Sequence, residues 1–410
     1  MTPEGGADAR PDRVAIWCGW LLVGLAPLVP LAGWLTPLSF SVLVALVGLL
    51  GLPAFRIRDE DRPAAVILFA ALIWAAVSTT WSPYHPSKLG NSTVLKLAFQ
   101  LPLYWSAVCV ARRADPRLAR LALDILAWGC AAFGAVLLVE AATAGALYKT
   151  LHVVYEPIRA DLAESNLGHS TFVLGLLWPV AVVSAEPRAR PWLALAMAAG
   201  VGAAALAFGS DAPVIGLVLA PLVALAAIRW PKGAPRVLGG VAAVLFLVMP
   251  VIVWAVRASG DYDALEHNLP LSWSLRMGYW SHAIDWIAQS PLRGWGLEAS
   301  RMFGPGIKLH PHNGELQAWM ELGVAGAVTA AAFWAVSFAR LSRTSASLPA
   351  AAVAASMAVY VLFGSLNFGL WQEWWLAMGA LVAMLAVLNA RLAERSRSAA
   401  CPSTATAFVE

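Results

Sequence analysis

Charged residues are scarce in this sequence, and their scarcity excludes a soluble globular protein. Only 13% of the 410 residues are Asp, Glu, Lys or Arg, whereas soluble domains usually carry about a quarter. Because 60% of the residues are hydrophobic, the folded chain cannot cover its apolar surface in water. The bilayer must therefore be its solvent. The 20 tryptophans agree with this interpretation, since indole rings prefer the membrane interface.

Metal ligands and cysteines are also sparse. The chain has four cysteines, and none has the spacing of a metal site or of a disulfide framework. No His and Cys residues gather into a ligand set. We therefore expect neither a metal nor a cofactor, and no nucleic acid partner. The first apolar run is too long for a cleavable signal peptide and is expected to remain as an anchor.

Apolar runs long enough to cross a bilayer recur along the whole chain. A spanning helix needs about 20 apolar residues, because the hydrocarbon core is about 30 Å thick. The runs predict an all-α polytopic membrane protein with about twelve transmembrane helices. They lie at 14–34, 36–54, 63–81, 91–111, 118–147, 167–185, 191–209, 212–229, 235–256, 315–340, 349–367 and 372–390.

The spacing of these runs divides the chain into four parts. Residues 1–256 hold the first nine helices, and residues 257–314 form the one long loop. Residues 315–390 hold the last three helices, and residues 391–410 are expected to form a disordered cytoplasmic tail.

The basic residues predict how the helices are oriented. With the N-terminus in the cytoplasm and the sides alternating, 19 of the 28 Lys and Arg residues lie in cytoplasmic segments. Because short cytoplasmic loops are enriched in Lys and Arg, we expect both termini in the cytoplasm and the long loop outside. That loop still carries five basic residues. They either bind an anion or are ordinary surface charges of a soluble cap.

A His-Pro-His-Asn sequence before the tenth span is the first candidate for chemistry. Asn313 is predicted to cap the helix, and His312 to lie just above the membrane surface. A histidine there can exchange a proton near neutral pH. Glu321 lies about two turns into the helix, where an ionisable side chain is costly. A lone interfacial His more often caps a helix, so this pattern gains weight only from its companions.

An arginine-led amphipathic helix precedes that sequence. Apolar residues recur at helical spacing over residues 273–287, which predicts a helix that lies flat on the bilayer. Arg276 lies at its start, and Arg293 lies just beyond Pro291, which ends it. The N–H donors of guanidinium groups suit the oxygens of a phosphate or pyrophosphate. Alternatively, both arginines are solvated helix ends that bind lipid headgroups.

A third polar stretch lies in the outward loop before the sixth span. It holds Arg159, Asn166 and His169. Alone, it indicates no more than a polar loop, and it becomes informative only beside the two other stretches.

In combination, the three stretches resemble the O-antigen ligase and O-antigen polymerase superfamily of the bacterial inner membrane. The strongest match is the pattern His-Asn-x-x-Leu-Gln-x-x-x-Glu-x-Gly-x-x-Gly, which this chain has from His312 to Gly326. The family's arginine-led helix with its Pro-x-x-Gly-x-Gly ending is matched by Arg276 and the segment from Pro291 to Gly296. Its earlier loop is similar to the third stretch. The resemblance covers roughly residues 155–330.

One departure from the family concerns the turn between the seventh and eighth spans. Members often carry a Ser-Arg pair there, and the Arg is thought to help hold the lipid-linked donor. This chain has Ser210 followed by Asp211. Either another cation, such as Arg159 or Arg257, supplies the charge, or the donor is handled differently.

The resemblance implies a metal-independent membrane glycosyltransferase with a class C-like architecture, acting on the periplasmic face. Its donor is an undecaprenyl-pyrophosphate-linked glycan, and its acceptor is a sugar hydroxyl on lipid A-core or on another glycan. Membrane lipids surround it. Because no metal takes part, side-chain cations must stabilise the departing pyrophosphate.

The resemblance also implies roles for the residues of the three stretches. We expect Arg276, with Arg293 and Arg159, to bind the pyrophosphate. We expect His312 to activate the acceptor hydroxyl for an attack that inverts the configuration. Glu321 is expected either to orient His312 or to serve as the partner of a buried polar group. The supporting residues are Asn313, His310, Asn166 and His169.

Three alternatives remain open at this stage. A polymerase that extends repeat units shares the donor chemistry, and only analogy of the His312 pattern favours a ligase. A transporter of lipid-linked oligosaccharides predicts matching halves with broken helices at mid-membrane, and the sequence shows no such symmetry. A scaffold role leaves the outward Arg and His residues unexplained. The glycan, the acceptor and the oligomeric state have no recognisable signature.

Overall fold

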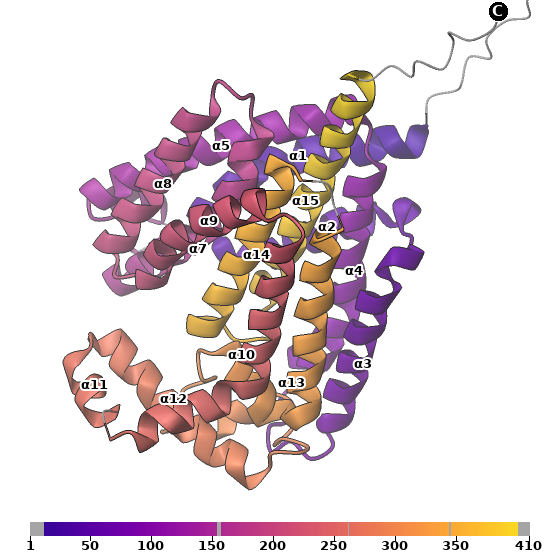
Figure 1. Cartoon of the computed structure of the whole chain (residues 1–410). Coiled ribbons are helices and arrows are strands. Elements are labelled where there is room, and N and C mark those ends of the chain that lie inside the picture. The colour runs from indigo at the N-terminus through magenta and orange to yellow at the C-terminus, as the bar shows by residue number, and fades with distance from the viewer. Residues whose placement is uncertain (1–11, 154–156, 261, 344–345, 401–410) are drawn as a thin grey trace, which may run out of the picture.

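The computed structural model describes residues 12–153, 157–260, 262–343 and 346–400 (Figure 1). Every regular element in these ranges is a helix, so the all-α prediction is confirmed. The α-helices are α1 (Arg13–Leu35), α2 (Phe40–Leu50), α3 (Arg62–Ser78), α4 (Thr93–Arg113), α5 (Pro116–Ala142), α6 (Ala146–Leu151), α7 (Ala160–Ser184), α8 (Arg190–Ala207), α9 (Asp211–Arg229), α10 (Gly233–Ala258), α11 (Tyr262–Asn268), α12 (Leu271–Gln289), α13 (Gly314–Leu341), α14 (Leu348–Leu366) and α15 (Glu373–Ala400). The 3₁₀ turns are η1 (Pro37–Ser39), η2 (Leu52–Ala54), η3 (Asp59–Asp61), η4 (Leu89–Asn91) and η5 (Ala299–Met302).

Eleven helices of the described chain are long and apolar enough to cross a membrane, which confirms a polytopic protein. The exception among the twelve predicted spans is 36–54, where α2 has only 11 residues between two 3₁₀ turns. Such a helix is about 17 Å long, shorter than the hydrocarbon core. The segment still returns the chain to the level at which α1 begins, because Trp17 Nε1 donates to Leu50 O at 2.9 Å. The predicted alternation of later helices is therefore kept.

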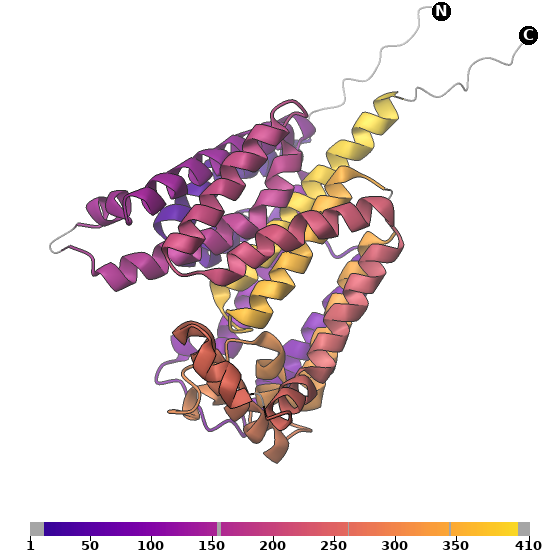
Figure 2. The same ribbon diagram turned by 60° about the vertical axis from the view of Figure 1, so that its left-hand side comes forward.

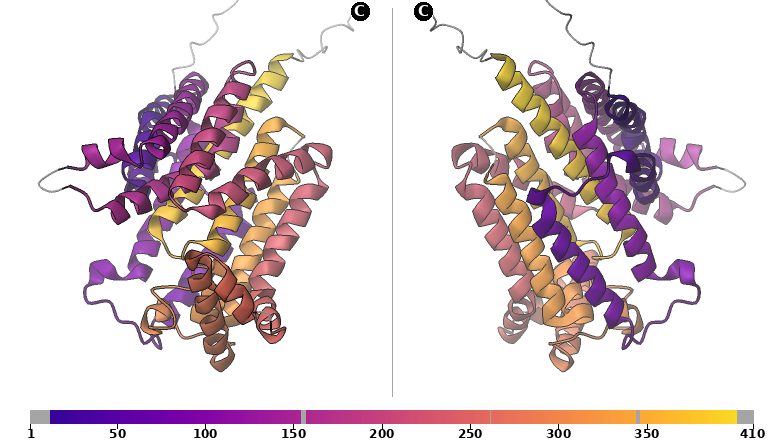
Figure 3. Two further views of the ribbon diagram at one scale, coloured as in Figure 1. Left: turned by 90° about the vertical axis from the view of Figure 1, so that its left-hand side faces the viewer. Right: turned by 90° about the vertical axis from the view of Figure 1, so that its right-hand side faces the viewer.

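The helices α3, α10 and α13 run side by side along one flank of the molecule (Figure 3). A buried ion pair ties them to the larger group at the end where α1 begins and α15 ends. Asp61, only 1% exposed, accepts hydrogen bonds from Arg112 of α4 and Arg340 of α13. Removing one partner from a buried pair typically costs about 3–5 kcal/mol, so this contact fixes the relative position of three helices.

The helix α13 is broken at Gly323, where φ is 64° and ψ is −157°. A broken helix leaves backbone groups unpaired, and such groups are costly inside a membrane. Here the loop 291–296 fills the break. Trp295 N donates to Met320 O at 2.9 Å, and Gly296 N donates to Glu321 O at 2.8 Å. We call this interlock of loop 291–296 with the α13 break the clasp.

Glycines are required in the clasp because two backbones approach closely there. A Cβ atom on Gly294 would lie 2.4 Å from Glu321 O, and one on Gly323 would lie 2.3 Å from Leu292 O. Both residues also have positive φ, which side chains disfavour. The Gly positions of the two sequence patterns are thus explained by packing.

The predicted amphipathic helix is present as α12, but its apolar face is covered by protein. Ala283, Ile284 and Ile287 are buried against residues of α10 and α13, including Val253 and Met320. The long loop is therefore a folded cap on the end of α10 and α13, visible at the bottom of Figure 1.

Two predicted loop regions are instead helical. The helix α7 starts at Ala160, so Asn166 and His169 lie within it rather than in a loop. Ala, Leu and Glu in its first turns are good helix formers and extend the helix beyond the apolar run. Likewise α15 continues through Ala400, which corrects the predicted disorder from residue 391; residues 401–410 lie outside the described residues.

Candidate active site

The structure brings Arg276 and His312 to one residue, Asn367, in the turn between α14 and α15. The His312 Nδ1 atom lies 2.9 Å from Asn367 O. With the Asn367 amide oxygen turned toward the guanidinium, Arg276 Nη2 donates to it at 2.8 Å. The ring of Tyr279, one turn after Arg276 on α12, stacks on His312 with centroids 5.8 Å apart. Two residues from separate elements therefore share one environment.

The hydrogen bond to Asn367 fixes the tautomer of His312. A carbonyl oxygen only accepts, so Nδ1 carries the proton and Nε2 presents a lone pair. Burial lowers the pKa of His312; the bond to Asn367 O opposes this effect, and the charge of Arg276 adds to it. The ring is therefore neutral near pH 7. Its Nε2 has no hydrogen-bond partner among the described residues, so it is free to accept a proton.

His310 supports the backbone of His312. Its Nδ1 accepts from His312 N at 3.1 Å, and the two rings are 4.3 Å apart. Nε2 of His310 therefore carries the proton, and the amide of Gln372 lies 3.1 Å from it. Burial, with the nearby His312 and Arg301, lowers the pKa of His310 to about 3. These contacts hold His312 in the left-handed region, at φ 53°, which a non-glycine residue rarely adopts.

Arg276 is half-buried, and Trp273 as well as Asn367 contacts its guanidinium. Its guanidinium carbon lies 5.2 Å from the centroid of the indole ring. The indole Nε1 in turn donates to Asp211 Oδ2 at 2.7 Å. Burial lowers the pKa of Arg276, and the carboxylate of Asp211 raises it. The guanidinium stays charged, because its ordinary pKa lies far above neutrality.

Glu321 is saturated by four donors and belongs to the clasp. Its two carboxylate oxygens accept from Glu298 N at 2.8 Å, Ser300 Oγ at 2.6 Å, Gln317 Nε2 at 3.0 Å and Trp371 Nε1 at 2.7 Å. The residue is fully buried. None of these four donors is His312, whose Nδ1 faces Asn367 O instead. The geometry therefore matches the second of the two expected roles, that of partner to buried polar groups.

Asn313 caps α13, as its place in the sequence predicts. Its Oδ1 accepts from Leu316 N at 2.8 Å, and its Nδ2 donates to Ser365 O at 2.9 Å. The cap thus also ties the start of α13 to the end of α14, beside Asn367.

The structure does not bring Arg159 or Arg293 to Asn367. Arg159 is exposed and donates to Asp161 Oδ2 at 2.6 Å. Arg293 lies over Trp81, with its guanidinium carbon 5.8 Å from the ring centroid. The helix α12 separates it from Arg276 by about 20 Å of helical rise.

His169 and Asn166 lie on α7, at the other flank of the turn. The ring of His169 is 5.5 Å from Trp374 and 6.2 Å from Phe368, and its Nδ1 faces Ser165 O at 2.7 Å. The backbone oxygen of Asn166 accepts from Ser170 Oγ at 3.1 Å. His169 therefore packs beside the site, whereas Asn166 has no contact with Asn367 among the described hydrogen bonds.

Residues 193–331 match a family model described as O-antigen ligase. Residues 193–331 are therefore similar to the O-antigen ligase family and are called the O-antigen ligase segment. It contains Asp211, Arg276, His312 and Glu321, and it ends before Asn367.

Curated proteins similar to this chain come from Rickettsia. A protein of Rickettsia conorii named "Putative polysaccharide ligase" is 26% identical over 153 residues, which cover 34% of this chain and 37% of that protein. Similarly named proteins of Rickettsia felis and Rickettsia prowazekii are each 24% identical over 153 residues. The match thus spans little more than a third of the length of these relatives.

Sequence reasoning missed the turn 367–374, which lies beyond the O-antigen ligase segment. Besides Asn367, this turn supplies Trp371 to Glu321 and Gln372 to His310. Glu373, at its end, binds Lys96 Nζ at 2.7 Å. A signal was present: polar and aromatic side chains interrupt two apolar spans here, in the sequence Asn-Phe-Gly-Leu-Trp-Gln-Glu-Trp.

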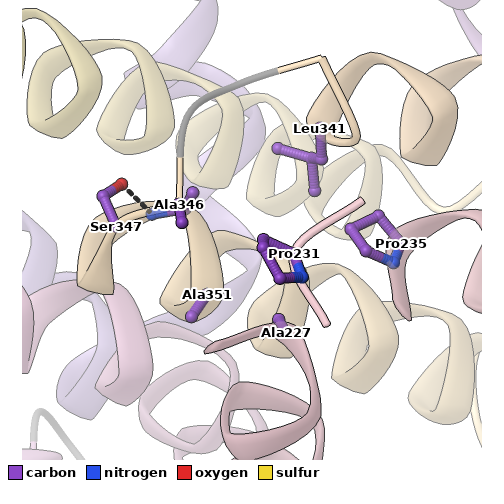
Figure 4. Close-up of a pocket in the computed structure, with 8 residues that line it drawn as sticks. Ala227, Pro231, Pro235, Leu341, Ala346, Ser347 and Ala351 are labelled. Carbon is purple, nitrogen blue, oxygen red and sulfur yellow. Dashed lines mark hydrogen bonds between the residues drawn. The ribbon is translucent and has the colours of Figure 1, made fainter. Parts of the chain in front are cut away.

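A hollow at the other end of the molecule carries no comparable chemistry (Figure 4). It lies between the ends of α9 and α13 and the start of α14, and its side chains are apolar except for Ser347. The Ser347 hydroxyl caps α14 by accepting from Ala350 N at 3.3 Å. Within the described ranges, no three His, Cys, Asp or Glu residues are grouped to hold a metal ion.

Proposed function

We propose that this protein is an O-antigen ligase-type glycosyltransferase. It moves a glycan from an undecaprenyl-pyrophosphate carrier to a hydroxyl of a lipid A-core acceptor. The observation that carries the proposal is the convergence of a charged Arg276 and a neutral His312 on Asn367. An anion-binding group and a proton acceptor side by side are what transfer from a diphosphate to a hydroxyl requires.

In this mechanism the acceptor hydroxyl attacks the anomeric carbon of the donor sugar. His312 Nε2 takes the hydroxyl proton as the new glycosidic bond forms. The bond between the anomeric carbon and the carrier diphosphate breaks on the opposite face, so the configuration inverts. The diphosphate leaves with the bonding electron pair, and the N–H donors of Arg276 stabilise its added charge.

The reaction belongs on the periplasmic face of the inner membrane. The site lies at the start of α13, whereas the basic loops cluster at the other end, where α1 begins and α15 ends (Figure 2). Basic loops favour the cytoplasm. With that end inside, His312 and Arg276 face the compartment in which lipid-linked glycans are assembled into surface polysaccharide.

The experiment is a transfer assay in detergent with a lipid-pyrophosphate glycan and lipid A-core. We expect His312→Ala and Arg276→Ala to lose transfer, because each removes a group that acts on the reacting atoms. Matched controls are His85→Ala and Arg188→Ala, which change exposed residues of the same types away from the site. Wild-type rates in both site variants would refute the proposal.

A repeat-unit polymerase is the nearest alternative, because it uses the same donor chemistry. Deletion of the protein in cells separates the two. Loss of a ligase leaves long glycan on the carrier lipid and none on the core, whereas loss of a polymerase leaves a single repeat attached to the core.

A further inference from the structure

Asp211 stands where the O-antigen ligase family often has an arginine, and its contact explains what it does in this chain. It is the first residue of α9, and its Oδ2 accepts from the indole Nε1 of Trp273 at 2.7 Å. Trp273 lies in the first turn of α12, one turn before Arg276. The same indole that donates to Asp211 through its edge supports the Arg276 guanidinium on its face, 5.2 Å from the centroid.

We propose that Asp211 is a positioning residue for Arg276 and that Trp273 is the spacer through which it acts. The proposal rests on the proposed function, in which Arg276 binds the donor diphosphate. Asp211 fixes the plane of the indole, and the indole fixes the guanidinium against Asn367. The turn before α9 thus still serves the donor site, by orienting a cation instead of supplying one.

The spacer matters because a guanidinium has a limited number of N–H donors. A direct pair with a carboxylate is often bidentate and uses two of the five donors. An indole face attracts the cation through its ring and uses none of them. With only one donor directed at Asn367, the remaining N–H groups of Arg276 stay available for diphosphate oxygens.

The carboxylate also acts at longer range, in a direction opposite to that of an arginine. Its negative charge favours the charged guanidinium, against the effect of burial, but it repels an incoming diphosphate. The positioning effect and the charge effect of Asp211 therefore predict different results when Asp211 or Trp273 is replaced. Positioning predicts that losing the hydrogen bond slows turnover, whereas charge alone predicts that losing the carboxylate helps donor binding.

Three substitutions separate these effects. Trp273→Phe keeps an aromatic face and every charge but removes the N–H that Asp211 accepts. Asp211→Ala removes the acceptor together with the charge, and Asp211→Asn keeps an amide oxygen that can accept from the indole without the charge. Ser272→Ala, an exposed residue on the same turn, is the matched control.

We expect Trp273→Phe and Asp211→Ala each to lower kcat by about tenfold, the lower end of the range for one hydrogen bond to a charged group. Asp211→Asn should keep kcat within about threefold of wild type and lower the donor KM. Because both residues act through one hydrogen bond, the double variant Trp273→Phe/Asp211→Ala should be no slower than the slower single variant. The apparent Tm of each variant in detergent should match that of the Ser272→Ala control.

Binding of inorganic pyrophosphate to the full-length protein, measured by calorimetry, separates this inference from the proposed function. We expect Arg276→Ala to abolish binding, Trp273→Phe to weaken it, and Asp211→Asn to strengthen it. If this pattern appears but wild type transfers no glycan, the proposed function fails and the positioning role stands.

Three outcomes of these assays would overturn the positioning role. In the first, wild type transfers glycan while Trp273→Phe and Asp211→Ala are equally fast. In the second, Asp211→Asn is as slow as Asp211→Ala, or the effects multiply in the double variant. In the third, Trp273→Phe and Asp211→Asn both bind pyrophosphate as tightly as wild type does.

Discussion

The His312–Arg276–Asn367 site and the clasp beside Glu321 both take residues from the pattern His312–Gly326, yet they differ in hydrogen bonding. Glu321 accepts from four donors, and the broken backbone beside it is paired by loop 291–296. At the site, by contrast, His312 Nε2 has no hydrogen-bond partner among the described residues. Arg276 uses one N–H donor for Asn367 and keeps others for a ligand. We infer that a polar side chain with all its hydrogen bonds made stabilises the fold. One with an unpaired donor or acceptor is available to bind or react with a substrate.

Replacing His312 should give the largest effect and change only the reaction. We expect His312→Ala to reduce kcat by about 10²–10⁴-fold, the usual contribution of a general base. Its removal leaves the clasp intact, so the Tm in detergent should stay within a few degrees of wild type. A reduction of less than tenfold would contradict the role of His312 as base.

Replacing Glu321 should instead damage the fold. The Glu321→Ala variant leaves four buried donors without an acceptor, and we expect a loss of about 3–5 kcal/mol in the free energy of unfolding. Thermal unfolding and the yield of folded protein measure this loss. A stable Glu321→Ala protein with a normal Tm and a slow turnover would place Glu321 in the reaction and erase the distinction between the two regions.

Acidification should inactivate the enzyme through His312. Its pKa is lowered below the ordinary value of about 6.5, so the neutral base is complete at pH 7 and is lost as pH falls through the lowered pKa. We expect kcat/KM to be flat from pH 8 to about 6.5 and to fall below it. In the Arg276→Gln variant, the fall of kcat/KM should occur at higher pH. The positive charge that lowers the pKa of His312 is then absent. If the fall of kcat/KM occurred at the same pH in both proteins, Arg276 and His312 would not interact.

Replacing Asn367 should have the smallest effect, and that effect should be limited to binding of the donor. In Asn367→Ala the bond to Arg276 is lost, but His312 keeps its partner because that partner is a backbone carbonyl. We expect the donor KM to rise about tenfold, as for one hydrogen bond to a charged group, while the pH limb of kcat stays in place. A shift of that limb would mean that the side chain also holds the imidazole.

Much of this fold was predictable because membrane spans and helix caps depend on residues that are close together in the sequence. Apolar runs gave eleven of the twelve spans, and Asn313 was recognisable as a cap from the turn before it. The short length of α2 could not be predicted, because the residues that flank it are also apolar. In the structure these flanking residues form 3₁₀ turns. The start of α7 was missed because helix propensity extends beyond the apolar run.

The site was predictable only where its residues lie within a motif. The motifs pointed to Arg276 and His312 but not to Asn367, because periodicity does not predict which distant turn folds over a helix start. The role of Glu321 depends on donors from two other segments and from its own helix, and the role of Asp211 depends on a single indole. Both require the tertiary structure.

The most direct measurement is a structure of the His312→Ala protein with an undecaprenyl-pyrophosphate glycan bound. We expect the diphosphate within hydrogen-bond distance of the Arg276 guanidinium, with the anomeric carbon turned toward the space left by the imidazole. A diphosphate held at Arg293 or Arg159, with Arg276 still closed on Asn367 and Trp273, would contradict this account.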